Sequence, residues 1–151
     1  MRKIMYVIAI LALAIPLFAA DPFVGTWKLD PAKSKYTAGT PSKDVTLVIE
    51  EQGENYQVTA TGSYQDGSPI SVKYTVPKAG GAGTAQEGPF DAITSKRVSA
   101  RVRENRYTKN GKETMSRRIV VSQDGKTLRI TAKGTDAQGK PVAGVDVFDK
   151  Q

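Results

Sequence analysis

Residues 69–77 of this chain read Pro-Ile-Ser-Val-Lys-Tyr-Thr-Val-Pro, and hydrophobic and polar side chains alternate along them. Successive side chains of a β-strand point to opposite faces, so the hydrophobic residues of this stretch would share one face. Its Ser, Lys and Thr residues would share the other face. The pattern predicts a strand with one buried and one solvated face, as in an antiparallel sheet.

The same alternation recurs on both sides of this stretch, and β-branched residues are frequent in it, as strands favour. Dipeptides that accept the positive φ of tight hairpin turns separate the segments. These dipeptides are Asp66-Gly67, Asn110-Gly111 and Asp124-Gly125. We therefore expect nine or ten strands, at residues 23–30, 43–52, 55–63, 69–77, 82–87, 91–99, 101–109, 112–122, 126–133 and 142–149.

Two stretches interrupt the pattern. Residues 31–42 contain two prolines, and they are expected to form a long loop with room for one helical turn. Residues 77–90 are rich in Gly and Ala, and they are expected to form either a flexible loop or a weak edge strand. No stretch after residue 20 keeps a hydrophobic period of about 3.6 residues, as a long amphipathic helix would.

Many short strands joined by nearest-neighbour turns favour an all-β fold, an antiparallel up-and-down (meander) barrel of about 8–10 strands. A sandwich would more often need long crossing connections. An outer-membrane barrel would need an apolar outer band, whereas the second face of these strands carries Thr, Lys, Ser and Arg. The outside of the barrel is therefore expected to be wet.

The N-terminus has a different composition. Arg2 and Lys3 precede an uncharged stretch, Ile4–Ala20, that ends in small residues. This layout is typical of a helical secretory signal peptide, with an uncleaved anchor as the alternative. We expect a signal peptide at 1–20 and one barrel domain at 21–151, exported to the periplasm or secreted, with no transmembrane span after cleavage.

The chain contains no Cys and no His. Disulfides, the usual zinc sites and nucleophilic centres that need Cys or His are therefore excluded. We expect no catalytic residue, no metal and no cofactor. The exception would be carboxylate or Tyr/Arg chemistry that converges inside the barrel. The carboxylates considered are Asp91, Glu104, Glu113, Asp146 and Asp149, and all are expected to be solvated.

The first predicted strand contains Phe23-Val24-Gly25-Thr26-Trp27. A Gly-x-Trp on the first strand resembles the opening of the lipocalin and fatty-acid-binding-protein superfamily, whose members are calycin-type barrels. The whole of residues 21–151 resembles bacterial exported lipocalin-like domain proteins. The resemblance implies that Trp27 plugs one end of the barrel and that a late-strand arginine, Arg117 or Arg118, covers it. The arginine-x-tyrosine pair that grips fatty-acid carboxylates in the family is absent.

The resemblance implies a binding module for a small apolar or amphipathic ligand. The residues expected to contact it are Leu47, Val58, Val72, Tyr74, Arg103, Arg117, Leu128 and Ile130. The alternative is a structural or interaction barrel that contacts an anionic polymer or envelope partner through basic residues 96–118, among which Tyr107 is interleaved. Nucleic acid is not an expected partner of an exported chain. The oligomeric state stays open.

Overall fold

The computed structural model describes residues 19–151, so the predicted signal peptide lies outside the described residues except for Ala19 and Ala20. The described part forms a 12-stranded sheet. Its strands are β1 (Gly25–Leu29), β2 (Lys35–Ala38), β3 (Ser42–Gln52), β4 (Asn55–Tyr64), β5 (Pro69–Pro77), β6 (Gly81–Ala82), β7 (Thr84–Glu87), β8 (Ala92–Ser99), β9 (Val102–Lys109), β10 (Lys112–Val121), β11 (Thr127–Thr135) and β12 (Pro141–Lys150).

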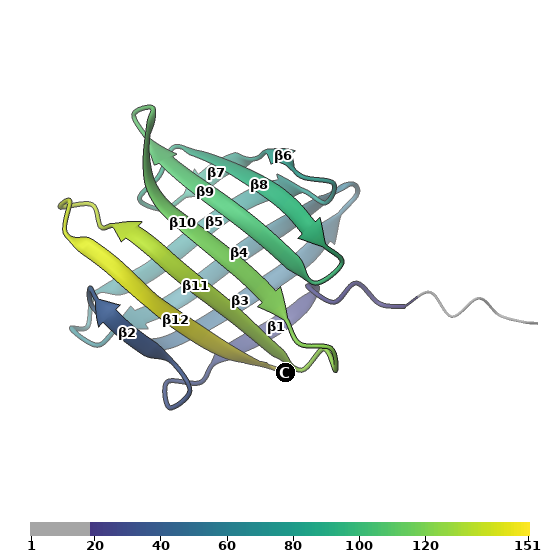
Figure 1. Cartoon of the computed structure of the whole chain (residues 1–151), viewed down its shortest axis with the longest axis horizontal. Coiled ribbons are helices and arrows are strands. Elements are labelled where there is room, and N and C mark those ends of the chain that lie inside the picture. Colours follow the sequence, from purple (N-terminus) through teal and green to yellow (C-terminus); the bar gives the residue numbers. More distant parts are fainter. Residues whose placement is uncertain (1–18) are drawn as a thin grey trace, which may run out of the picture.

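The sheet rolls up into a nearly closed antiparallel meander barrel. Its strand order is β6-β8-β9-β10-β11-β12-β1-β3-β4-β5-β7, so almost every strand pairs with its neighbours in sequence. Figure 1 shows β8 to β12 in front, with β3, β4 and β5 behind them. The predicted all-β meander barrel is confirmed, and each of the expected strands is present.

The barrel closes through the glycine-rich stretch for which the sequence left two interpretations open. Strands β6 and β7 stand at the two ends of the sheet order, yet only Gly83 separates them in sequence. β6 pairs with β8, β7 pairs with β5, and the Gly83 amide donates to the Ile93 carbonyl oxygen at 2.9 Å. The stretch is thus a strand that crosses from one sheet edge to the other, and not a flexible loop.

The expected loop at 31–42 contains a strand as well. β2 pairs with residues 143–145 of β12, beyond the part of β12 that pairs with β1. Between β1 and β2 the chain makes a turn in which the Asp30 carboxylate accepts hydrogen bonds from the amides of Ala32 and Lys33. The prediction of an unpaired loop was therefore wrong for residues 35–38, because pairing with β12 outweighs their weak local pattern.

Trp27 fills one end of the barrel, as the resemblance implied. Its side chain has 0% exposure, and its indole Nε1 donates to the Phe23 carbonyl oxygen at 2.9 Å. The cation over its ring is Lys150, whose Nζ lies 4.9 Å from the ring centroid. The expectation of an arginine there was wrong, because the register pairs Trp27 with Lys150.

Gly25 makes room for this arrangement, since a Cβ at this position would lie 2.7 Å from Cε of Lys150.

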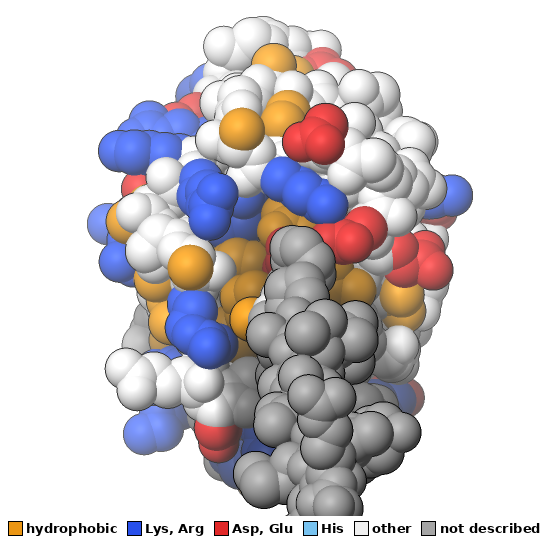
Figure 2. All heavy atoms as spheres, turned by 90° about the vertical axis from the view of Figure 1, so that its right-hand side faces the viewer, with side chains coloured by type: hydrophobic (Ala, Val, Ile, Leu, Met, Phe, Trp, Pro, Cys, Tyr) orange, Lys and Arg blue, Asp and Glu red, His pale blue; other side chains and the backbone are white. Residues whose placement is uncertain are grey.

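Figure 2 views the end of the barrel from which the N-terminal segment leaves, and it shows hydrophobic side chains in the middle with Lys and Arg side chains around them. Among residues 19–151, no helix is long and apolar enough to cross a membrane.

We predict that Gly83→Val prevents closure of the barrel. An added Cβ at Gly83 would lie 2.2 Å from the Thr75 carbonyl oxygen, and the backbone must separate to admit it. We expect a loss of about 3 kcal/mol or more in the free energy of unfolding, measured by chemical denaturation. The control is Ala82→Val at the neighbouring exposed position, which is expected to change stability by less than about 0.5 kcal/mol. Equal stability of the two variants would contradict this role.

Candidate functional site

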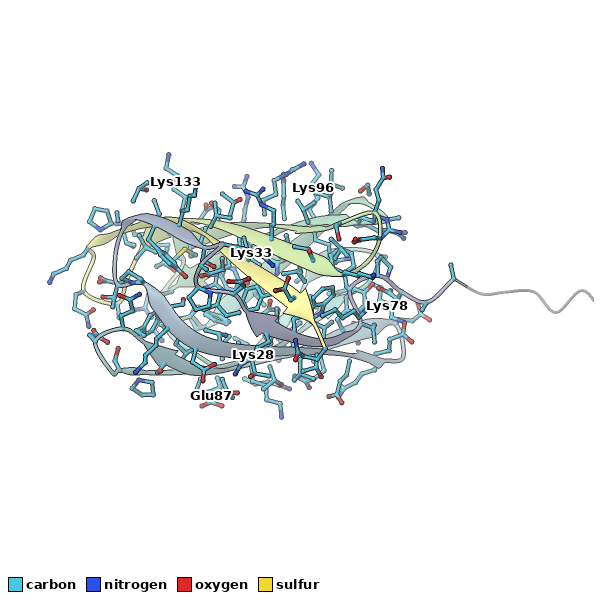
Figure 3. All side chains as sticks on the ribbon, turned by 90° about the horizontal axis from the view of Figure 1, so that it is seen from below. Lys28, Lys33, Lys78, Glu87, Lys96 and Lys133 are labelled. Atoms are coloured by element: carbon cyan, nitrogen blue, oxygen red, sulfur yellow. The ribbon has the colours of Figure 1, made fainter. Side chains whose placement is uncertain are left out.

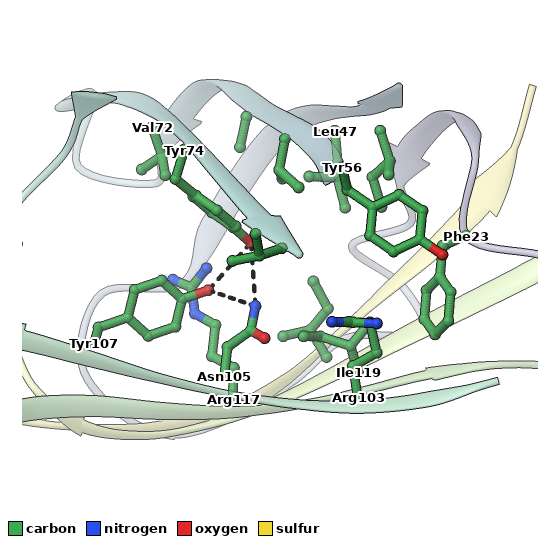
Figure 4. Close-up of a pocket in the computed structure, with 15 residues that line it drawn as sticks. Phe23, Leu47, Tyr56, Val72, Tyr74, Arg103, Asn105, Tyr107, Arg117 and Ile119 are labelled. Atoms are coloured by element: carbon green, nitrogen blue, oxygen red, sulfur yellow. Dashed lines mark hydrogen bonds between the residues drawn. The ribbon is translucent and has the colours of Figure 1, made fainter. Parts of the chain in front are cut away.

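The barrel encloses a cavity of about 50 Å³ between its two walls. The lining residues are Phe23, Leu47, Ile49, Tyr56, Val58, Ala60, Val72, Tyr74, Val76, Arg103, Asn105, Tyr107, Arg117, Ile119 and Ile130. The apolar members come mainly from β3, β4 and β5, and the polar members come mainly from β9 and β10. A compact molecule in the cavity would therefore meet a hydrophobic wall on one side and polar groups on the other (Figure 4).

A three-residue polar cluster stands at one end of this cavity. The Asn105 amide nitrogen lies 3.4 Å from the hydroxyl oxygens of both Tyr74 and Tyr107, and these two oxygens are 3.3 Å apart. All three contacts are longer than ordinary hydrogen bonds. Burial raises the pKa of Tyr74 well above its usual value. The side-chain oxygen Oδ1 of Asn105 is buried without a hydrogen-bond partner, so the cluster leaves one acceptor free.

Arg117 points into the barrel beside this cluster. Its guanidinium carbon lies 5.2 Å from the centre of the Tyr107 ring, and its buried Nε has no hydrogen-bond partner. No carboxylate of the described residues forms an ion pair with it. Burial disfavours its charge, but negative charge on Tyr107, Tyr74 or Asp146 favours it, and the pKa of Arg117 is raised on balance. Arg117 thus offers an unused cationic donor to the cavity.

Arg103 points into the barrel too, but its donors are occupied. Its Nη1 donates to the Lys78 carbonyl oxygen at 2.7 Å, and its Nη2 donates to the Pro77 carbonyl oxygen at 2.7 Å. Its Nε and Nη2 also donate to the Ser95 hydroxyl, which is buried. Arg103 therefore ties the turn after β5 to β8 next to the closing strand, and it is a structural residue in this arrangement.

The N-terminal segment closes the cavity at the Arg103 end. The Phe23 ring packs against the Tyr56 ring with 6.0 Å between centroids, and the Tyr56 hydroxyl donates to the Asp21 carboxylate. Burial, followed by the Asp21 hydrogen bond, raises the pKa of Tyr56. The guanidinium of Arg103 lies 5.3 Å from the Tyr56 ring centroid. This end is sealed by side chains, whereas the unused donor of Arg117 lies towards the other end (Figure 4).

Asp146 also belongs to the inner surface, which the sequence did not predict. It pairs in register with Ile130, a cavity residue, and residues directly opposite each other share a face. The Tyr36 hydroxyl from β2 donates to its carboxylate. Burial and this hydrogen bond raise the pKa of Tyr36 to about 12. The expectation of a fully solvated carboxylate was therefore wrong for Asp146, because β2 covers it.

The structure brings most of the expected ligand contacts together. Leu47, Val58, Val72, Tyr74, Arg103, Arg117 and Ile130 all line the cavity. Leu128 does not line it, and its side chain is fully buried in the core instead. Arg118 points outward, half exposed, and pairs with Glu104, so it has no place near Trp27.

Sequence reasoning missed Asn105, Tyr107, Phe23 and Tyr56 as cavity residues. The signal for the first two was available, because they follow Arg103 at steps of two residues along β9 and so share its face. Phe23 precedes the first strand, so alternation could not place it. Tyr56 shares a face of β4 with Val58, so alternation did give its direction.

The arrangement suits binding better than catalysis. Among residues 19–151, no group of three or more acidic side chains is placed to hold a metal ion. The hydroxyls of Tyr74 and Tyr107 face each other and Asn105, and no general base adjoins them in the described part of the chain. The side chains around the cavity can contact a molecule through hydrogen bonds, charge and apolar surface.

Comparisons with known proteins give the fold. Zebrafish ileal bile acid-binding protein complexed with cholic acid aligns with a TM-score of 0.50 and 13% identity, over 86% of this chain and 99% of that one. Lobster apocrustacyanin A1 aligns with a TM-score of 0.46 and 12% identity, over 87% of this chain and 62% of that one. No protein-family model and no curated protein matches the sequence. The chain has the fold of a calycin-type barrel.

We predict that the two inward arginines differ in their effect on stability. Arg103→Met removes the donor of the Lys78 carbonyl oxygen and one donor of the Pro77 carbonyl oxygen, which keeps the Gly80 amide, and we expect a loss of about 2–4 kcal/mol in the free energy of unfolding. Arg117→Met removes a cation that has no ion-pair partner, and we expect a change of less than about 1 kcal/mol. Urea denaturation measures both. A large loss for Arg117→Met would identify it as a structural residue instead.

We predict that Tyr36 makes the fold sensitive to alkaline pH. Its folded pKa of about 12 lies above the usual value of 10.0, so the fold favours the neutral hydroxyl. This contribution to stability is complete below about pH 10, and it is lost as the pH rises through about 12. Tyr36→Phe is expected to flatten the decline of stability over this window, measured by denaturation at a series of pH values. An unchanged slope would contradict the linkage.

Proposed function

We propose that this barrel binds a small amphipathic molecule in its cavity, with an acidic group of the ligand at Arg117 and its apolar part along β3, β4 and β5. The observation that carries the proposal is the buried, unpartnered Nε of Arg117 at the edge of a largely apolar cavity. Hydrogen bonds from a guanidinium to a carboxylate are among the stronger ones available in proteins. An acidic group is therefore the ligand feature that this site recognises best.

The neighbours of Arg117 define the rest of the ligand's polar end. The side-chain oxygen Oδ1 of Asn105 has no partner and can accept a hydrogen bond from a ligand. The hydroxyls of Tyr74 and Tyr107 are held only by long contacts. These groups favour a ligand that carries a donor, such as a hydroxyl, near its acidic group. Away from them the walls are aliphatic, and they match a compact hydrocarbon portion.

The size of the cavity limits the ligand. Its volume of about 50 Å³ holds a few water molecules, whereas pockets for drug-sized ligands measure about 300–1,000 Å³. The ligand is therefore compact, or the side chains around it move when it binds. Met115, an adaptable side chain packed against the core next to Arg117, is well placed for such movement.

The shared fold supports the proposal. The zebrafish protein that aligns with this chain is described with cholic acid, an amphipathic carboxylic acid. That protein is thus found in complex with a ligand of the proposed kind. No catalytic step is proposed for this barrel. The proposed place of action is outside the cytoplasm, which the sequence of residues 1–20 supports, and cell fractionation with mass determination of the mature chain tests it.

The test compares straight-chain carboxylates, from butanoate to hexadecanoate, with the alcohols of equal length by isothermal titration calorimetry. We expect the carboxylates to bind about tenfold or more tightly than the alcohols, because only they pair with the guanidinium. Arg117→Met is expected to abolish this difference. The preferred chain length then reports how far the cavity opens.

Arg118→Met is the matched control, since Arg118 neighbours Arg117 on β10 but points outward to Glu104. This variant is expected to keep the preference for carboxylates. Equal affinities of the unsubstituted protein for acids and alcohols would overturn the role of Arg117. Failure of every member of both series to bind would overturn the cavity as a binding site.

A further inference from the structure

The outer face of strands β8 to β11 carries a regular array of cations. In one row of the sheet Lys96, Glu104 and Arg118 lie side by side, and in the next row Arg106, Ser116 and Lys133 do so. Arg129 adds a further cation on β11. Neighbouring strands lie about 4.8 Å apart, so cations two strands apart in one row are spaced by about 10 Å. The positions and the spacing of these cations are thus fixed by the register of the strands.

Positive charge dominates this face. Its outward cations are Lys96, Arg106, Arg118, Arg129 and Lys133, and its outward carboxylates are Glu104 and Glu113. Both carboxylates already pair with arginines of the same face, Glu104 with Arg118 and Glu113 with Arg106. These ion pairs are solvent-exposed and therefore weak, so a polyanion can compete for them. Figure 3 shows Lys96 and Lys133 on one side of the barrel and Lys28 and Glu87 on the opposite side.

A groove of about 360 Å³ lies at the edge of this face, where β10 and β11 meet. Lys112 and Lys133 line it, and so does Glu113, whose charge is already paired with Arg106. The hydroxyls of Thr114, Ser116 and Thr135 line it as well. Each of these hydroxyls donates to a backbone carbonyl oxygen, so each leaves its lone pairs free to accept. The groove therefore combines ammonium groups, which attract carboxylates, with hydroxyl oxygens, which accept hydrogen bonds from alcohols.

The remaining chemistry of the face selects among polyanions. Tyr107, the aromatic residue within the basic stretch of sequence, points into the barrel and is buried, so it offers no stacking surface for a nucleic-acid base. The outward hydrophobic residues of this face are Val98, the most exposed of them, with Val102 and Val120. Valines are small, and they give a lipid bilayer little to anchor. Glu104 and Ser116 lie between the cations of the two rows, and Thr94 and Thr131 flank them.

We propose that this outer face, with the groove between β10 and β11, binds an acidic polysaccharide such as a polyuronate. A polymer of this kind presents carboxylates at intervals along an extended chain, and its hydroxyl groups donate hydrogen bonds between them. The carboxylates match the spaced cations, and the hydroxyls match the accepting oxygens of Thr114, Ser116 and Thr135. The surface is separate from the cavity, so this inference does not depend on the proposed ligand of the barrel interior.

The experiment measures binding of the full chain to alginate, a polyuronate, by biolayer interferometry at low and at physiological salt. Binding is expected at low salt and is expected to weaken as salt rises, because exposed charges are screened. Lys112→Gln combined with Lys133→Gln is expected to weaken it about five- to tenfold. The matched control is Lys43→Gln combined with Lys73→Gln, two exposed lysines of β3 and β5 that remove the same charge elsewhere on the barrel. This control is expected to keep most of the affinity.

Three outcomes would overturn the proposal. An equal loss in the two double variants would show that only the overall charge of the protein matters. Tighter binding to single-stranded DNA or to phosphatidylglycerol vesicles than to alginate would assign the face to a different partner. Absence of alginate binding at low salt would leave the face without this function. Carboxylate binding in the cavity, measured on the same variants, is expected to stay unchanged in every case.

Discussion

The rest of the structure depends on how the sheet closes on itself. An open sheet would leave unpaired N–H and C=O groups along two edges, whereas a barrel pairs nearly all of them. Here β6 pairs with β8, and β7, which follows it directly in sequence, pairs with β5. The change of partner occurs at Gly83, where a side chain would collide with Thr75. Arg103 holds the neighbouring turn in place through two backbone carbonyl oxygens. No disulfide assists, since the described chain has no cysteine.

Closure also creates the distinction between the two faces of every strand. Arg117 and Arg118 are adjacent in sequence, yet one faces the cavity without a carboxylate partner and the other faces solvent beside Glu104. Placing a cation on the inside costs free energy unless something compensates it, and this cost is the physical basis of the proposed ligand contact at Arg117. The outward cations carry no such cost, and their common sign gives the outer face a positive potential.

The two ends of the barrel are built for different purposes. At one end Trp27, Phe23 and Tyr56 pack together with the N-terminal segment and seal the interior. Towards the other end the inner surface becomes polar, with Tyr74, Asn105 and Arg117 around the cavity and the Tyr36–Asp146 contact beyond them.

Local sequence determined the strands, because alternation along each strand reports which side chains share a face, and turn dipeptides report where strands end. It therefore predicted the meander barrel and the inward position of Leu47, Val58 and Val72, whereas the plug at Trp27 was implied by the resemblance of the Gly-x-Trp segment to a known family. It did not determine which residue covers Trp27 or that β2 shields Asp146, because both follow from pairing with β12, more than a hundred residues away in sequence. The tertiary structure alone decided that Arg103 is occupied and Arg117 is free. Alternation gives the same inward direction to both, and only the surrounding carbonyl oxygens distinguish them.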